Sequence, residues 1–168
     1  QYLNTRAGSN RGRIYAIAKK NKTENKIPKL AGLKQSDLVY HLNHENSWVR
    51  DTAQRLIIES DTSDIVPGLK VLLEETDNAK ARIHILWLLG LLGHMDDEVL
   101  EASFKDDHPE VRRNALLLSE LHSESNVNRR AQSAESMLEL LRDPSSAVRF
   151  QAMLSISSGY ENGKIENI

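Results

Sequence analysis

The chain has 168 residues, of which 39% are hydrophobic and 27% charged, and a formal net charge of −2. This apolar share can bury a core, so the composition indicates one folded domain or one repeat array and excludes a disordered chain. The absence of cysteine excludes disulfides, thiolate metal sites, thiol nucleophiles and covalent haem attachment. Since the longest apolar run, residues 85–93, is about half of what a bilayer requires, no membrane insertion is expected.

The first predicted element is a β-strand in RGRIYAIAKK, residues 11–20, where apolar residues alternate over two faces. A lone strand leaves its backbone donors and acceptors unpaired. We therefore expect this strand to be held against the rest of the chain, another molecule or a copy of itself. We interpret it as the remnant of a preceding domain, which would make the chain an excerpt of a larger multidomain protein.

Charge separates the first 34 residues from the others. Residues 1–34 carry nine Lys and Arg residues and one acid, a net charge of +8, whereas residues 35–168 carry 13 bases and 23 acids, a net charge of −10. A basic arm can bind the phosphates of nucleic acid by releasing counterions, but a solvated linker explains the same residues. We divide the chain into a strand remnant and basic linker (1–34), a repeat domain (35–160) and a polar tail (161–168).

The repeat domain contains four copies of one amphipathic helix. Each copy centres on Val-Arg or Ala-Arg, and mostly apolar residues stand one before and three, six and seven after the arginine, which is one side of a helix. The arginines are separated by 32, 30 and 37 residues. They are Arg50, Arg82, Arg112 and Arg149.

A shorter helix is predicted before each copy, from Ser-Asp pairs, an early proline or acidic residues at its start. The four segments are residues 36–43, 63–75, 95–104 and 128–143. Neither helix of a pair can cover its apolar face alone, which is typical of an α-solenoid. The predicted fold is therefore all-α, a right-handed α-solenoid of about four helix pairs over residues 36–160, with a short N-terminal strand.

The third and fourth copies share a signature of aspartate, proline, a few polar residues, Val-Arg and then alanine. It occurs as DDHPEVRRNA at 106–115 and as DPSSAVRFQA at 143–152, while the first two copies depart from it. The pattern resembles HEAT repeats of the short type also found in phycobilisome-lyase-like proteins. In such repeats the arginine ties neighbouring helix pairs together through acids and turn carbonyls, so the resemblance implies a structural role for Arg50, Arg82, Arg112 and Arg149.

A longer match runs from Arg11 to about Ile58 and includes the distinctive string WVRDTAQR, residues 48–55. It is similar to a junction in large bacterial extracytoplasmic proteins labelled membrane-bound dehydrogenases, where a β-propeller resembling glucose/sorbosone dehydrogenases precedes HEAT repeats and often a c-type cytochrome domain. The resemblance implies an extracytoplasmic or periplasmic location. It also implies that any sugar-dehydrogenase-like or PQQ-dependent active site lies outside this chain.

The histidines and acids form no pattern that predicts catalysis. His41 and His44 lie three residues apart and His94 is followed closely by two aspartates, but neither set offers the three protein ligands of a catalytic zinc. His84 lies in the most apolar helix and is expected to be a core histidine. A glycine-rich phosphate loop and a nucleophile elbow are both absent from the sequence. We expect no catalytic residue, metal or cofactor here.

The candidate interaction patch lies one and five residues after each arginine, because these positions point away from the shared apolar side, toward the expected concave face. Five of the six such residues in the last three copies are apolar: Ile83, Trp87, Leu117, Phe150 and Leu154. An exposed patch of this kind usually marks a contact site, whereas tight curvature or neighbouring helices would bury it. The accessible areas of Trp87, Phe150 and Leu154 distinguish the two cases.

Two classes of function fit these observations. The first is a non-catalytic scaffold or protein–protein interaction module that holds a partner protein or neighbouring domains of the same polypeptide. The second is nucleic-acid binding by the basic arm together with the repeats. The net charge of −10 over the repeats argues against the second, because a phosphate-binding concavity should be basic. An accessory role in a sugar-dehydrogenase-like enzyme rests on the resemblance alone.

Overall fold

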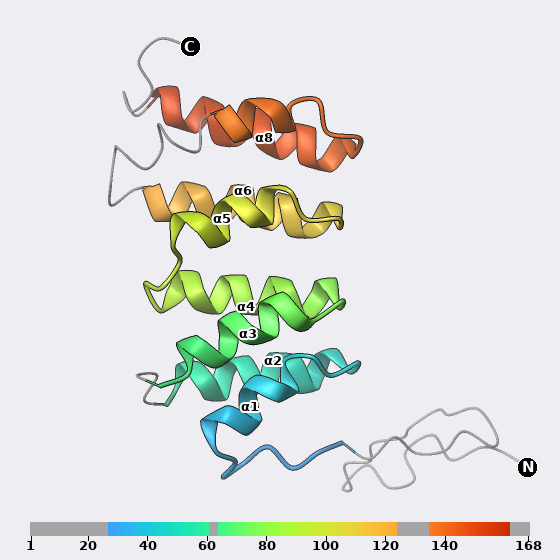
Figure 1. Ribbon diagram of the computed structural model, residues 1–168, viewed down its shortest axis with the longest axis vertical. Coiled ribbons are helices and arrows are strands. Elements are labelled where there is room, and N and C mark those ends of the chain that lie inside the picture. The colour runs from blue at the N-terminus through green and yellow to red at the C-terminus, as the bar shows by residue number, and fades with distance from the viewer. Residues whose placement is uncertain (1–26, 61–63, 124–134, 162–168) are drawn as a thin grey trace, which may run out of the picture.

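The computed structural model describes residues 27–60, 64–123 and 135–161. Within these ranges the regular secondary structure is entirely helical, and the helices stack in pairs along the long axis from the N-terminal to the C-terminal end (Figure 1). The predicted all-α solenoid of about four helix pairs is therefore confirmed. The predicted strand of residues 11–20 and the end of the polar tail lie outside the described residues.

In each of the first three pairs a shorter helix is followed by a longer one, and the fourth pair is described in part. The pairs are α1 (Gln35–His41) with α2 (Ser47–Ile58), α3 (Val66–Glu75) with α4 (Ala79–Leu91), α5 (Asp97–Phe104) with α6 (Pro109–Ser123), and helical residues 135–140 with α8 (Ser146–Glu161). The longer helices contact one another in the order α2, α4, α6, α8, and α1 contacts α3. The helices thus form two layers in which each pair touches its neighbours in the stack. None of the described helices is long and apolar enough to span a membrane.

Polar side chains in the turns fix where the longer helices begin. The Asn46 side chain accepts a hydrogen bond from the backbone N–H of Trp48 (3.0 Å), and the Asn78 side chain accepts one from Lys80 (3.1 Å). Such caps satisfy backbone donors that the first helical turn leaves free. Helix α4 ends at Leu91, and Gly93 two residues beyond has a φ of 73°, which favours glycine and lets the chain turn toward α5.

The core lies between the two layers of helices. The residues one before and three after each arginine are at most 1% exposed in all four copies. They are Val49, Ala53, Ala81, Ile85, Val111, Ala115, Val148 and Ala152. The apolar side predicted from the repeat is therefore the buried side, and burial of this stripe drives the pairing of helices that would be marginal alone.

Candidate functional site

Each of the four repeated arginines donates hydrogen bonds to backbone carbonyls of the turn before its own helix. The contacts are Arg50 Nη1 to His44 (2.7 Å) and Glu45 (2.9 Å), Arg82 Nη1 to Thr76 (2.8 Å), Arg112 Nη1 to Asp106 (2.6 Å) and Asp107 (3.0 Å), and Arg149 Nη1 to Asp143 (2.8 Å) and Pro144 (3.0 Å). A guanidinium with several N–H groups can satisfy such orphan carbonyls without losing its charge. The repeated arginine therefore holds each turn in one conformation.

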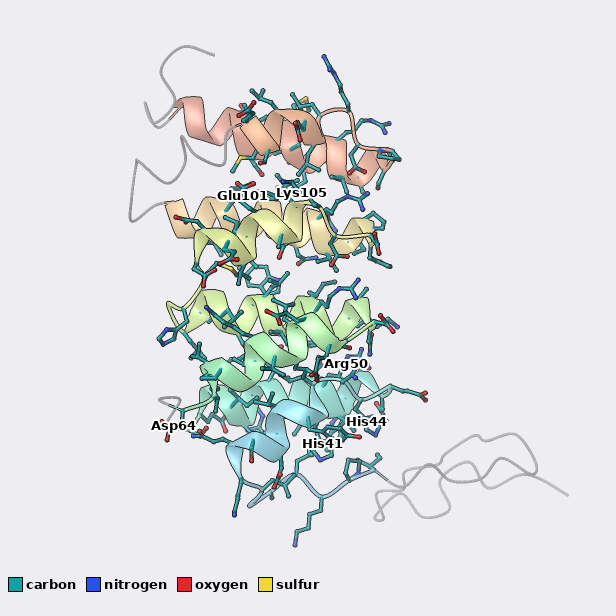
Figure 2. The ribbon with its side chains drawn as sticks, viewed as in Figure 1. His41, His44, Arg50, Asp64, Glu101 and Lys105 are labelled. Carbon is teal, nitrogen blue, oxygen red and sulfur yellow. The ribbon has the colours of Figure 1, made fainter. Side chains whose placement is uncertain are left out.

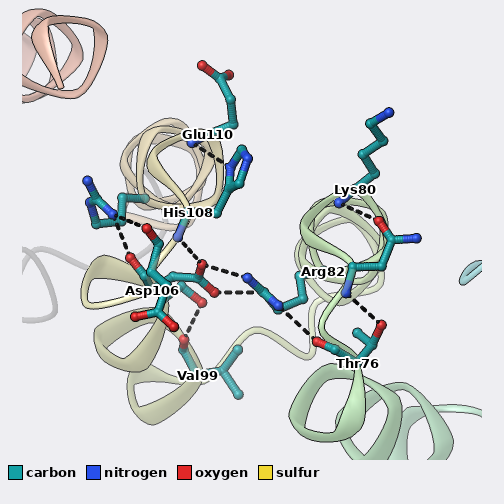
Figure 3. Close-up of polar contacts among 11 residues, drawn as sticks. Thr76, Lys80, Arg82, Val99, Asp106, His108 and Glu110 are labelled. Atoms are coloured by element: carbon teal, nitrogen blue, oxygen red, sulfur yellow. Dashed lines mark hydrogen bonds and ion pairs between the residues drawn. The ribbon is translucent and has the colours of Figure 1, made fainter.

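Two of the arginines also bind an aspartate of the next helix pair. Arg82 Nη2 donates to Asp106 Oδ1 (2.9 Å), while its Nε lies 2.8 Å from Oδ2 as an ion pair without hydrogen-bond geometry (Figure 3). Arg112 donates through Nε and Nη2 to both oxygens of Asp143 (2.7 and 2.8 Å). Each carboxylate also accepts a backbone N–H of its own turn at 2.8 Å. One aspartate thus links the turn of its own pair to the arginine of the preceding pair.

The Arg112–Asp143 contact is the more buried of these links, with side chains 13% and 4% exposed. The hydrogen bond from Arg112 lowers the pKa of Asp143 below its ordinary value, and the same bond raises the pKa of Arg112. Both groups are therefore charged at neutral pH and pair with each other. This pairing supports a structural role for the contact.

The first and last arginines lack this acidic partner. Thr76 stands at the position of Asp106 and Asp143, six residues before the next arginine, and Arg50 Nε is buried with no hydrogen-bond partner. Arg149 is exposed, and no carboxylate among the described residues pairs with it. The link between helix pairs is thus complete only at the two central arginines.

His84 of α4 connects the first two helix pairs through side chains of α2. Its Nδ1 meets the Gln54 side-chain oxygen and therefore carries the proton, because an amide oxygen only accepts. Its Nε2 lies 3.7 Å from Asp51 Oδ1, and the side chain is 17% exposed. Burial lowers the pKa of His84 below 6.5 and the charge of Arg50 lowers it further, while Asp51 opposes the shift. The folded chain therefore holds His84 neutral.

We predict that His84 makes folding stability fall in mild acid. Because the folded pKa is lower than the unfolded one, its contribution is complete above pH 6.5, and it is lost as pH drops below that value, where the unfolded chain binds the proton more readily. Urea unfolding monitored by circular dichroism between pH 7.5 and pH 5 would measure this loss. The loss should shrink in His84→Gln and persist in His94→Gln, at an exposed histidine; an equal loss in both variants would contradict the assignment.

The predicted interaction patch divides between exposed and half-buried residues. Phe150 and Leu154 of α8 are 59% and 44% exposed. Ile83, Trp87 and Leu117 are half-buried, and the Trp87 indole donates to Asn114 Oδ1 (2.8 Å). Near-complete burial would have argued against the interaction patch, and none of these residues shows it. That the patch binds a partner is still a prediction.

Two further leucines extend this surface and were missed by the sequence reasoning. Leu91 of α4 and Leu121 of α6 are 61% and 54% exposed, and each stands one turn beyond Trp87 or Leu117, nine residues after its arginine. Continuing the same register by one helical turn would have found them. We define the concave strip, named after the concave face that the sequence predicts for these positions, as Trp87, Leu91, Leu117, Leu121 and Leu154.

A hollow of about 340 Å³ opens between α4 and α6 within the concave strip. It is lined by Trp87, Leu91 and Leu121 together with Gly90, Gly93, Met95 and Leu118. A Cβ at Gly90 would lie 2.9 Å from Leu118 Cδ2, so glycine allows the two helices to approach closely at this point. The hollow is lined mainly by apolar side chains, and its volume lies at the small end of the range for ligand pockets.

The histidines and acids do not gather into a site. No group of three or more His, Asp or Glu side chains is placed to hold a metal ion in the part of the chain that the structure describes. His41 and His44 lie near Arg50 in the first pair, with ring centroids 6.4 Å apart, whereas other polar residues lie elsewhere along the stack (Figure 2): Asp64, Glu101 and Lys105.

A protein-family model described as HEAT repeats matches residues 36–119. The match covers half of the sequence, from the start of α1 to near the end of α6, and it includes three of the four repeated arginines. No curated protein and no solved structure matches the chain.

Proposed function

Because the chain belongs to the HEAT repeat family, we propose that it is a scaffold that binds a partner protein through the concave strip. HEAT repeats typically mediate protein–protein interaction and are generally non-catalytic. The observation that carries the proposal is the exposure of Leu91, Leu121 and Leu154 on three successive long helices. Exposed large apolar side chains that gather on one surface usually mark a contact site.

The strip has a clear end at the first helix pair. The positions that are apolar in α4 and α6 are Arg55 and Glu59 in α2, and these two side chains form an exposed ion pair of 2.9 Å. A partner would therefore lie across α4, α6 and α8, with charged side chains bordering it at α2. Completing the burial of three half-exposed leucines contributes roughly 2–4 kcal/mol, which suits a transient contact unless further residues join it.

The finer proposal concerns the context of the scaffold. The similarity of residues 11–58 to the junction in dehydrogenase-like multidomain proteins supports a role in holding neighbouring domains of one polypeptide, with residues 35–160 as the repeat unit. In that context the redox chemistry belongs to the neighbouring domains. The repeats would set the distance and orientation between those domains.

The proposed function predicts that the double variant Leu91→Ser/Leu121→Ser loses partner binding while keeping its fold. Both side chains are more than half exposed, so their loss removes contact area without leaving a large cavity. Proteins that the wild type captures and the double variant does not should be purified. Each is then titrated with both forms by calorimetry. We expect the dissociation constant for the double variant to be at least about tenfold higher.

The matched control is Val71→Ser on α3, an aliphatic side chain that is 52% exposed outside the concave strip. It should bind the partner like the wild type. Equal binding by the strip variant and the wild type would contradict the proposal. Retention of the chain on heparin or DNA at low salt, with release as salt rises, would instead favour nucleic-acid binding.

A further inference from the structure

Helix α8 carries an exposed side chain at a register position that is buried in α4 and α6. Leu86 of α4 and Leu116 of α6, four residues after their arginines, are fully buried, and the next long helix packs on each of these helices. Met153 occupies that position in α8 and is 53% exposed. The last long helix therefore presents an apolar side chain at the place where the two preceding helices are covered.

Arg149 of α8 also differs from the arginines of α4 and α6, in its polar contacts. Like Arg82 and Arg112 it donates through Nη1 to the preceding turn, but those two arginines also use Nε and Nη2 for the aspartate of the next pair. Arg149 is exposed and has no carboxylate partner within the described residues. Its Nη1 contacts match those of Arg112, and no contact of its Nε or Nη2 is found within the described residues.

The end face, which we define as Arg149, Phe150 and Met153, combines a guanidinium with two side chains that are 59% and 53% exposed. We propose that the end face docks a helical hairpin of a partner whose turn carries an aspartate or glutamate. The chain itself shows this mode of packing twice, where Asp106 meets Arg82 and Asp143 meets Arg112. The carboxylate pairs with Arg149 while an apolar helix of the hairpin covers Met153 and Phe150.

Charge complementarity favours a hairpin of this kind over a second copy of the chain. The aspartate stands six residues before the arginine in the third and fourth pairs, but in the first pair that position is His44. A second copy stacked by its first pair would therefore bring an imidazole and not a carboxylate to Arg149. The end face shares no residue with the concave strip, and the inference rests on Arg149 and Met153, so it does not depend on the proposed function.

The test is a fluorescence anisotropy titration of the full chain with a labelled peptide of residues 95–123, the hairpin of α5 and α6 that carries Asp106. Because short helices are marginal alone, a lactam staple on the exposed side of each helix holds the peptide helical, and circular dichroism verifies this before the titration. We expect saturable binding below 1 mM, weakened at least about tenfold by Arg149→Gln in the chain or by Asp106→Asn in the peptide. Combining the two changes should weaken binding no further, because both remove one contact. Met153→Asp should weaken binding similarly without touching the turn carbonyls, while Leu121→Ser in the concave strip should leave it unchanged.

Three results would overturn the proposal. The first is the absence of saturable binding at 1 mM. The second is binding that neither Arg149→Gln nor Met153→Asp weakens. The third is self-association of the chain alone that is lost in Arg149→Gln, measured by sedimentation, which would assign the end face to a second copy.

Discussion

Replacing Arg112 with methionine should lower the free energy of unfolding by about 3 kcal/mol, because it leaves the Asp143 carboxylate buried without its cation. Asp143 is 4% exposed at its side chain and accepts two hydrogen bonds from Arg112. Methionine keeps much of the volume of the arginine stem, so the loss reports on the charge and the hydrogen bonds rather than on packing. Urea unfolding of the wild type and the variant at pH 7 measures the difference.

The neighbouring residue provides a matched control. Arg113 forms an ion pair of 3.2 Å with Glu110 one turn away, and the two side chains are 42% and 46% exposed. Arg113→Met should therefore cost less than about 1 kcal/mol, since exposed ion pairs gain little in high dielectric. Comparable losses in Arg112→Met and Arg113→Met would show that the link between helix pairs is not the reason for the effect.

The Arg112 variant should also change the response to acid. Hydrogen bonding to Arg112 lowers the folded pKa of Asp143 below 3.8, so its contribution to stability is complete above that value and is lost as pH falls through the folded pKa. Arg112→Met removes the cause of the shift. The gap in stability between the two proteins should therefore be largest at neutral pH and narrow in strong acid.

Replacing Leu116 with alanine should cost about 3 kcal/mol, whereas Met153→Ala at the equivalent position of α8 should cost less than about 1 kcal/mol. Leu116 is fully buried on α6, against which α8 packs, so its truncation leaves a cavity, while Met153 is 53% exposed. The two substituted residues stand at the same position of the repeat. They differ because a following long helix packs on α6, whereas none among the described residues packs on the far side of α8. Denaturation curves of both variants test the difference, and a Met153 loss as large as that of Leu116 would show that the end of the stack is already covered.

The repeat in the sequence determined the fold because the same chemistry recurs in each copy. Small or branched apolar residues one before and three after the arginine leave a helix with one apolar side, and a helix of this length needs a second one to cover that side. The partner helices and the all-α stack follow from this pattern, as does the burial of residues such as Val49 and Ile85. These features depend on local periodicity, which can be recognised from the sequence alone.

The surfaces for binding depended on which pair stands next to which in the folded stack. Leu116 and Met153 have the same register, yet one is buried and the other exposed, because a further helix pair covers only the first among the described residues. Arg112 and Arg149 lie in the same motif, yet only Arg112 meets a carboxylate, contributed by the following pair. Sequence periodicity shows the face that a helix offers. Tertiary packing decides which faces are covered, because burial depends on neighbours that the register of a single helix does not encode.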